Sequence, residues 1–426
     1  MAAREDSSAV ERLACPDCGL LQVLPPPRKG FVTECPRCQR VLAGAATGRI
    51  DAPLALICTA LLLLLPAAVS PLMAVSIVGA VRKSWLPSSA SAMWEDGFAS
   101  LGTLVGLFSI AIPAAFMGLL VWVLGSLHFG RDSRLGPAFR WAQHLRPWVM
   151  IEVFLVGCFV AYSRIRVISA VDVTLGGWCL IAATLVLLVA LAQLDARTVW
   201  AALPWADAER KGLAREGSAP EARSNTVPNG PGVACTVCDL LVPRPLSHCP
   251  RCEARLYVRK PDSYRRTLTF VIAGYLLYIP ANTLPVLTIV RFGKEDPNTI
   301  LSGVMELIHN RLWPLAVIVF SASIVLPLLK LCSLTWMLIA IRRRSRHMLV
   351  GRTKLYRMID LVGRWSNIDV FMVSVLVAIL QFGTLTSVHA GKGLVAFGAV
   401  VIITMFATIF FDCRLMWDAP ARRAHV

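Results

Sequence analysis

Long apolar segments alternate with short polar ones along most of this chain. With their flanks, eight of the apolar segments can cross a membrane, because about 20 residues at a rise of 1.5 Å span a hydrocarbon core of about 30 Å. We expect spans at Pro53–Val78, Leu101–Leu127, Val149–Tyr162, Val173–Leu194, Leu268–Val290, Trp313–Ile341, Ile368–Phe382 and Leu394–Phe411. The pattern predicts an α-helical polytopic membrane protein.

The composition agrees with this pattern. Hydrophobic residues make up 56% of the chain and charged residues only 16%, whereas an average soluble domain is about 25% charged. The first fifty residues are polar and contain four cysteines, so we expect no cleavable signal peptide there. The first span is then expected to act as its own insertion signal.

The formal net charge of +17 is unevenly distributed. Eight Lys or Arg residues lie between Arg342 and Arg364, and four lie between Arg131 and Arg146. The loops on the opposite side hold about two each, and this asymmetry places the two basic loops in the cytoplasm. RNA binding by a basic loop is the competing interpretation, but no aromatic-interleaved binding module accompanies it.

The chain consists of one unit used twice. At an offset of 214 residues, two cysteines and two prolines recur: Cys35, Cys38, Pro66 and Pro71 match Cys249, Cys252, Pro280 and Pro285. At an offset of 217, WVMIEVF from Trp148 matches WSNIDVF from Trp365, and DARTVW from Asp195 matches DCRLMW from Asp412. Each unit is a cysteine module followed by four spans.

Because four is even, both cysteine modules and both termini are expected on the same side, which the basic loops make cytoplasmic. The halves are then parallel repeats about an axis along the membrane normal. The predicted organisation is a zinc ribbon (1–50), a transmembrane module (51–200), a flexible linker (201–233), a second ribbon (234–260), a second transmembrane module (261–418) and a tail (419–426).

Each half begins with two Cys-x2-Cys pairs. The predicted metal ligands are Cys15, Cys18, Cys35, Cys38, Cys235, Cys238, Cys249 and Cys252. Two such pairs place four thiolates around one Zn²⁺ at about 2.3 Å, and a set of four leaves no open position for catalysis. The expected cytoplasmic location argues against disulfides, and the lack of a βαβ pattern argues against a thioredoxin-like pair. We therefore predict two structural zinc ions, with iron or redox use as the alternatives.

Two ionisable residues lie inside the expected spans of the second half. Lys330, in SIVLPLLKLCSLTWML, and Asp369, in RWSNIDVFMVSVLV, fall at comparable depth in the cytoplasmic half of the bilayer. A charge at the bilayer centre costs about 3 kcal/mol on insertion scales, so such residues usually face protein or water and pair with each other. The sequence thus predicts an ion pair between them.

Comparison of the two halves identifies further polar positions. Lys330 is matched by Phe116, and Asp369 is matched by Glu152. The other polar positions of the second half are Ser323, Ser366, Asn367 and Thr404. One-sided enrichment favours a working site, in which Asp369 changes protonation and releases or engages Lys330. In the alternative interpretation, Lys330 snorkels to the headgroups and Asp369 starts a helix at the interface.

Other motifs have structural interpretations. Pro280 and Pro285 are expected to kink a helix, where Asn282 satisfies freed backbone groups or lines a cavity. The repeated Asp-x-Arg-x-x-Trp motif, at Asp195 and at Asp412, is interpreted as anchoring at the membrane interface.

The chain resembles the paraquat-inducible protein A family in four features. These are a four-cysteine ribbon, four spans whose first helix contains YIPANTLP, the segment SGVMELIHNRLWPLAVIVFSASIVLPLLKL that follows, and the repetition of this whole unit. This family includes the inner-membrane component of the lipophilic envelope-spanning tunnel system, and the resemblance covers nearly the whole chain. It implies a Gram-negative inner-membrane protein that moves lipid between membranes beside a periplasmic tunnel of MCE domains. By the same resemblance, the polar positions of the second module include Lys330, Asp369, Ser323, Ser366 and Thr404.

The expected function is therefore that of an inner-membrane transport subunit, not an enzyme. It would pass phospholipid to or from a periplasmic MCE-domain tunnel, with no nucleic-acid partner. No Walker-type loop is present, so proton coupling or passive exchange is expected instead of ATP use. The alternatives are a zinc-ribbon scaffold or sensor that binds a cytoplasmic partner, and a membrane thiol oxidoreductase.

Overall fold

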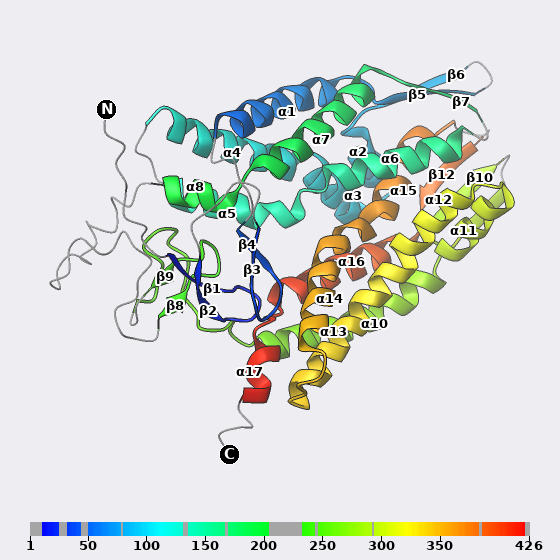
Figure 1. Cartoon of the computed structure of the whole chain (residues 1–426). Coiled ribbons are helices and arrows are strands. Elements are labelled where there is room, and N and C mark those ends of the chain that lie inside the picture. Colours follow the sequence, from blue (N-terminus) through cyan, green and yellow to red (C-terminus); the bar gives the residue numbers. More distant parts are fainter. Residues whose placement is uncertain are drawn as a thin grey trace.

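Helices make up most of the computed structural model, which describes residues 11–24, 32–43, 50–77, 80–130, 135–166, 169–203, 232–242, 246–291, 294–382 and 386–421. The helices form a bundle, with the two cysteine modules at one end and two small sheets at the other (Figure 1). The predicted helical class is confirmed.

Seven helical segments of the described chain are long and apolar enough to cross a membrane. They are α1 (Asp51–Val69), Ala99–His128, Leu135–Ile165, α7 (Leu175–Gln193), Trp313–Arg342, Leu349–Ile379 and α16 (Lys392–Phe410). The fifth expected span corresponds to α10 (Ser263–Thr283), a helix of 21 residues that is not among the seven. Arg265, Arg266 and several Tyr, Thr and Asn residues make this helix less apolar.

A π-helical turn interrupts the second span of each half. In the first half it is η1 (Leu107–Ala111), between α3 (Ala99–Gly106) and α4 (Ile112–His128). In the second half it is η5 (Ser321–Val325), between α12 (Trp313–Phe320) and α13 (Leu326–Arg342). Each turn precedes a proline that lacks an N–H donor, Pro113 or Pro327, so the repeated break has a local cause.

The third span of each half is also broken, by a 3₁₀ turn. The order is α5 (Leu135–Leu145), η2 (Arg146–Trp148) and α6 (Ile151–Ile165) in the first half. In the second half it is α14 (Leu349–Val362), η6 (Gly363–Asn367) and α15 (Ile368–Ile379). The apolar pattern detected only α6 and α15, because polar residues interrupt α5, which carries Arg140 and His144, and α14, which carries three Lys or Arg residues.

Helices α1 and α10 are shorter than the spans expected at Pro53–Val78 and Leu268–Val290. Helix α1 ends at Val69 and α10 at Thr283, and the apolar residues that follow form strands β5 (Met73–Ile77) and β10 (Leu287–Arg291). The residues before Pro71 and Pro285 have extended backbones, as proline requires of its predecessor. Pro71 and Pro285 therefore lie just beyond the helix ends. Pro66 and Pro280 lie inside α1 and α10, where the expected disturbance of the helix stays a prediction.

The strands that follow α1 and α10 are the central strands of two three-stranded antiparallel sheets. Strand β5 lies between β6 (Ala80–Ser84) and β7 (Ala170–Val173), while β10 lies between β11 (Lys294–Asn298) and β12 (Thr386–Ala390). A short helix follows β6 and another follows β11: α2 (Ser88–Glu95) in the first half and α11 (Ile300–His309) in the second. Each half therefore has a sheet that covers the end of its helices away from the cysteine modules (Figure 1).

The two halves meet where α6 packs against α15. The rings of Phe154 and Phe371 lie 5.4 Å apart in an edge-to-face arrangement. Gly157 makes the approach possible, because a Cβ atom there would lie 2.9 Å from Cβ of Phe371. Small residues commonly allow such close helix contacts in membranes. Within the first half α1 packs on α7, and within the second half α10 packs on α16, so the same pairing of first and last helix occurs in both halves.

Candidate functional site

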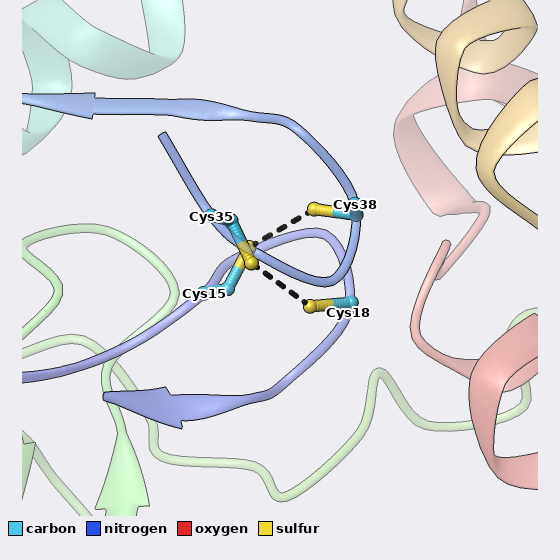
Figure 2. A group of neighbouring side chains, drawn as sticks. All are labelled: Cys15, Cys18, Cys35 and Cys38. Atoms are coloured by element: carbon cyan, nitrogen blue, oxygen red, sulfur yellow. Dashed lines mark hydrogen bonds between the residues drawn. The ribbon is translucent and has the colours of Figure 1, made fainter. Parts of the chain in front are cut away.

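The eight predicted cysteine ligands form two separate groups of four. Cys15, Cys18, Cys35 and Cys38 lie together in the first module, as Figure 2 shows, and Cys235, Cys238, Cys249 and Cys252 lie together in the second. Within each group the sulfur atoms all lie within 4.8 Å of one another, and all eight cysteines are buried as free thiols.

The spacing of the sulfur atoms fits a tetrahedral metal ion. Across the first group, Cys15 and Cys38 are 3.4 Å apart and Cys18 and Cys35 are 3.6 Å apart. The corresponding pairs of the second group are both 3.5 Å apart. A tetrahedron with metal–sulfur bonds of about 2.3 Å has edges of about 3.8 Å, so a small expansion accommodates the ion.

Each Cys-x2-Cys turn ends on a residue with a left-handed backbone. These residues are Gly19, Gln39, Asp239 and Glu253, with φ angles of 72°, 56°, 58° and 58°. In all four turns their N–H groups donate to the carbonyl of the first cysteine, at 2.8 to 3.1 Å. The fold thus imposes a conformation that favours glycine at three positions occupied by other residues. Four repeated turns of this kind indicate that both modules are built around the same ligand geometry.

The first cysteine module docks on the second half of the chain. Arg357 of α14 donates to Asp17 Oδ2 at 2.6 Å, to the Cys38 carbonyl at 2.9 Å and to Cys38 Sγ at 3.3 Å. Asp17 is only 4% exposed and also pairs with Arg40. Arg37 lies over the ring of Trp417, in α17 (Leu415–Ala421), at 4.6 Å.

The second cysteine module docks on the first half. Arg140 of α5 donates to the Cys252 carbonyl at 2.9 Å. Arg251 donates to the Trp200 carbonyl at 3.2 Å and lies over its ring, in α8 (Ala196–Ala202). A Cβ atom at Gly136 would lie 2.2 Å from the Arg251 carbonyl oxygen, so only glycine permits this contact. Burial raises the pKa of Asp239 in this module to about 6, against the opposing effect of Arg197.

The two modules are therefore exchanged between the halves. The tryptophans of the repeated Asp-x-Arg-x-x-Trp motif, Trp200 and Trp417, are both buried and each contacts the cysteine module of the other half. The interpretation of this motif as a membrane-interface anchor is wrong. The motif is visible in the sequence, but the sequence does not indicate that each tryptophan contacts the cysteine module of the other half.

Lys330 is buried within the second transmembrane module. It is 2% exposed, and its ammonium group donates to the Gly363 carbonyl at 2.7 Å and to Thr404 Oγ1 at 3.4 Å. Gly363 is the first residue of the 3₁₀ turn η6, and a Cβ atom there would lie 2.4 Å from Lys330 Cε. Lys330 therefore does not snorkel to the surface.

Asp369 lies apart from Lys330, and the predicted ion pair between them is wrong. No ion pair of the described residues contains Lys330, and its acidic neighbour is Asp360. The polar neighbours of Asp369 are Ser323 of η5 and Arg164 of α6, which comes from the first half. Asp369 is 3% exposed, and its Oδ1 atom has no hydrogen-bond partner among the described residues.

Other predicted polar residues surround the same helix break. Ser366 and Asn367 are buried in η6, and neither the Ser366 hydroxyl nor the Asn367 carbonyl oxygen has a hydrogen-bond partner among the described residues. The Asn367 amide donates to Met150 Sδ at 2.8 Å. Unpaired buried polar atoms are rare, and three of them lie in this one short segment.

Two predicted residues have other roles. Glu152 pairs with Arg364 at 3.2 Å and so links α6 of the first half to η6 of the second. The Asn282 amide donates to the Tyr278 carbonyl of its own helix at 2.9 Å, which is the backbone-satisfying role expected near a proline. Three residues of the polar segment and of the docking contact of the first cysteine module were not predicted from the sequence: Arg164, Gly363 and Arg357. Nothing in the repeat pattern distinguishes them.

A duplicated helical bundle with two exchanged cysteine modules and a buried polar segment defines a two-module polytopic membrane protein. The sequence profile of the paraquat-inducible protein A family matches residues 50–204 and 264–420, once in each half. The chain belongs to this family, and the resemblance seen in its sequence is confirmed.

Relatives of known name match over nearly the full length. The chain is 29% identical to the intermembrane transport protein PqiA of Escherichia coli (strain K12), over 99% of both chains. It is 28% identical to the lipophilic envelope-spanning tunnel protein A of the same strain, over 95% of this chain and 91% of that one. A probable intermembrane transport protein of Haemophilus influenzae is 24% identical over 90% of each chain. No solved structure matches the chain.

Substitution of Gly363 by alanine is expected to move the Lys330 ammonium group off the Gly363 carbonyl. Loss of this charge-assisted hydrogen bond should lower the free energy of unfolding by about 2 kcal/mol, measured by denaturation in detergent. Gly118→Ala is the control, because a Cβ atom there meets nothing within 4 Å. The double substitution Gly363→Ala with Lys330→Met should recover most of the loss. An unchanged stability in Gly363→Ala would contradict the assignment.

Proposed function

We propose that this protein is the inner-membrane subunit of a system that transports phospholipid between the membranes of a Gram-negative envelope. The observation that carries the proposal is the full-length likeness to two proteins named for intermembrane transport and for an envelope-spanning tunnel. The buried polar segment around Lys330 supplies a site at which such transport can be controlled. Transport, and not catalysis, is the function proposed.

The proposed topology has eight spans, both termini and both cysteine modules on the cytoplasmic side. Helix α10 is the eighth span, because it holds the place in the second half that α1 holds in the first and packs on α16 as α1 packs on α7. The basic segment from Arg342 to Arg364 supports the cytoplasmic assignment of that end of the bundle.

Each cysteine module is proposed to bind one structural zinc ion. Four thiolates form a closed set, in which the ion cross-links two short hairpins that are too small to hold a core alone. Arg357 would stabilise the negative charge of the first site through its contact with Cys38 Sγ. The modules then act as rigid cytoplasmic connectors between the halves.

The control site is proposed to be the polar segment of the second module. Lys330 is bound by a carbonyl and a hydroxyl, not by a carboxylate, so its charge is available to a lipid phosphate or to a moving acid. Asp369 is buried with one unpaired oxygen and lies between the two halves beside Arg164. A proton taken up by Asp369 would weaken its attraction to Arg164 and so alter the contact between the halves. Ser323, Ser366, Asn367 and Thr404 offer the hydrogen bonds that such a change needs.

The partner is proposed to be a periplasmic MCE-domain tunnel protein. The two sheets lie at the end of the bundle away from the cysteine modules (Figure 1) and form the surface on that side. Two contacts join the halves there. Asp96 accepts hydrogen bonds from His389 at 3.1 Å and from the Ala390 N–H at 3.0 Å, and Arg82 donates to the Gln381 carbonyl at 2.5 Å.

One observation favours the second candidate, a scaffold or sensor for a soluble cytoplasmic partner. The first cysteine module exposes the apolar side chains of Leu21, Val23, Val32 and Val41, each more than 50% exposed. Exposed apolar side chains on a small module can serve as a surface for a protein partner. This role is compatible with transport if the partner regulates it.

Lys330→Gln and Asp369→Asn are each expected to lower phospholipid transfer at least tenfold, because each removes a charge that the protein has buried. The measurement is transfer of a labelled phospholipid from proteoliposomes containing the purified protein to the MCE partner. Lys354→Gln, which changes an exposed lysine of α14, is the control. Normal rates in both variants, with normal expression, would remove the polar segment from the mechanism.

The protein as purified is expected to contain about two zinc ions per chain. Arg357→Ala should make the first site lose its ion at a chelator concentration about 10-fold to 100-fold lower, since partners of metal ligands contribute that much to affinity. Zinc retained per chain is the quantity measured, with Lys354→Ala as the control on the same helix. Absence of zinc, or identical retention in Arg357→Ala, would contradict this assignment.

Tagged protein from native membranes is expected to co-purify with an MCE-domain protein. Capture of a soluble cytoplasmic protein alone, lost in Val23→Ser with Val41→Ser, would instead favour the scaffold. Val81→Ser, at an exposed apolar position of β6, is the matched control for the loss of surface hydrophobicity.

A further inference from the structure

A groove of about 640 Å³ lies between α10 and α13, at the cysteine-module end of the bundle. The lining residues of α10, from Tyr264 through Leu268 and Ile272 to Tyr275, recur at intervals of three and four and so share one face of the helix. On α13 the lining runs from Thr335 through Ile339 to Arg342 with the same spacing. Two helix faces therefore form the walls of one elongated groove.

The walls of this groove are apolar. Val271 and Leu338 form its buried base, whereas Leu268, Ile272 and Ile339 are exposed along its edges. From Tyr264 to Tyr275 the groove follows the helix for about 16 Å, which suits an acyl chain of a dozen or more carbons. At the inner end, the Tyr275 hydroxyl is hydrogen-bonded to Thr335 at 3.3 Å, so no strong polar group is left unpaired there.

The mouth of the groove is cationic. Arg342, in the last turn of α13, and Arg343, which follows it, both line the groove and are both exposed. Within the part of the chain that the structure describes, neither guanidinium group has an ion-pair partner. Guanidinium groups bind phosphate by paired, charge-assisted hydrogen bonds. A charged mouth joined to an apolar groove matches an amphiphile with an anionic head.

We propose that this groove binds an anionic glycerophospholipid of the adjacent leaflet. Its phosphate lies on Arg342 and Arg343, and one acyl chain lies along Leu268, Ile272 and Ile339. Zwitterionic lipid matches the apolar walls but not the two unpaired charges, and free phosphate matches the charges but not the walls. The lipid therefore binds with selectivity for net negative charge.

This site is separate from the polar segment around Lys330. At 100° per residue, the lining positions from Thr335 to Arg343 lie on average about 150° around the helix axis from Lys330. The side chain of Lys330 is directed instead to Gly363 and Thr404. Lipid binding in this groove is independent of the proposed transport function, because it is measured as lipid retained by the protein. Failure to retain lipid would not change the result of the phospholipid-transfer assay.

The test measures lipid retained by the full-length protein. The protein is reconstituted in bilayers of phosphatidylcholine and phosphatidylglycerol at about 9 to 1, extracted in mild detergent, purified, and its lipid quantified by mass spectrometry. We expect phosphatidylglycerol to be enriched several-fold over the bilayer ratio. Arg342→Gln with Arg343→Gln should return the ratio to that of the bilayer. Lys294→Gln with Arg311→Gln, which removes two positive charges at the other end of the bundle, should keep the enrichment.

A second pair of variants tests the apolar walls. Ile272→Trp fills the groove and should lower the retained phosphatidylglycerol, whereas Leu276→Trp, one turn further along α10 at a position outside the groove, should not. Soluble glycerol phosphate should not displace the lipid at millimolar concentration. The proposal is overturned if wild-type protein shows no enrichment, if the Arg342 and Arg343 variant retains it, if Ile272→Trp has no effect, or if glycerol phosphate competes.

Discussion

An ammonium group buried in a hydrocarbon layer must find its hydrogen bonds within the protein, and Lys330 does so at a helix break. The 3₁₀ turn η6 interrupts the α14–α15 segment and begins at Gly363, whose carbonyl accepts a hydrogen bond from Lys330. The absence of a side chain at Gly363 gives the lysine room. The same break places Ser366, Asn367 and Asp369 at the interface of the two halves.

The first cysteine module is connected to this arrangement through α14. Arg357, which contacts Cys38 and Asp17, lies six residues before Gly363, a distance of about 9 Å along the helix. One helix thus connects the first cysteine module to the carbonyl that accepts a hydrogen bond from Lys330. The interior of the second half and the surface module of the first half are physically coupled by a single element.

Features with a strict local rule could be predicted from the sequence. The cysteine pairs identified both modules because four sulfurs at that spacing have few alternatives, and the 214-residue offset identified the repeat. The ends of α1 and α10 could not be predicted, because their following strands are as apolar as the helices and the period of such short runs is ambiguous. The sequence predicts that Lys330 pairs with Asp369, whereas Lys330 donates to the backbone carbonyl of Gly363, and a backbone acceptor leaves no trace in the sequence. Arg164 was missed because it lies in the other half.

The exchange of the cysteine modules has a further meaning for the history of the chain. Each half receives a module from the other, at Trp200 and Trp417, by equivalent contacts. Two identical subunits that traded their terminal modules would form the same arrangement about a two-fold axis, which is a swapped dimer. Joining those subunits end to end would keep the equivalent contacts at Trp200 and Trp417 and make the copies unequal. Afterwards one copy can acquire charges such as Lys330 while its twin stays apolar, a divergence that a symmetric dimer does not permit.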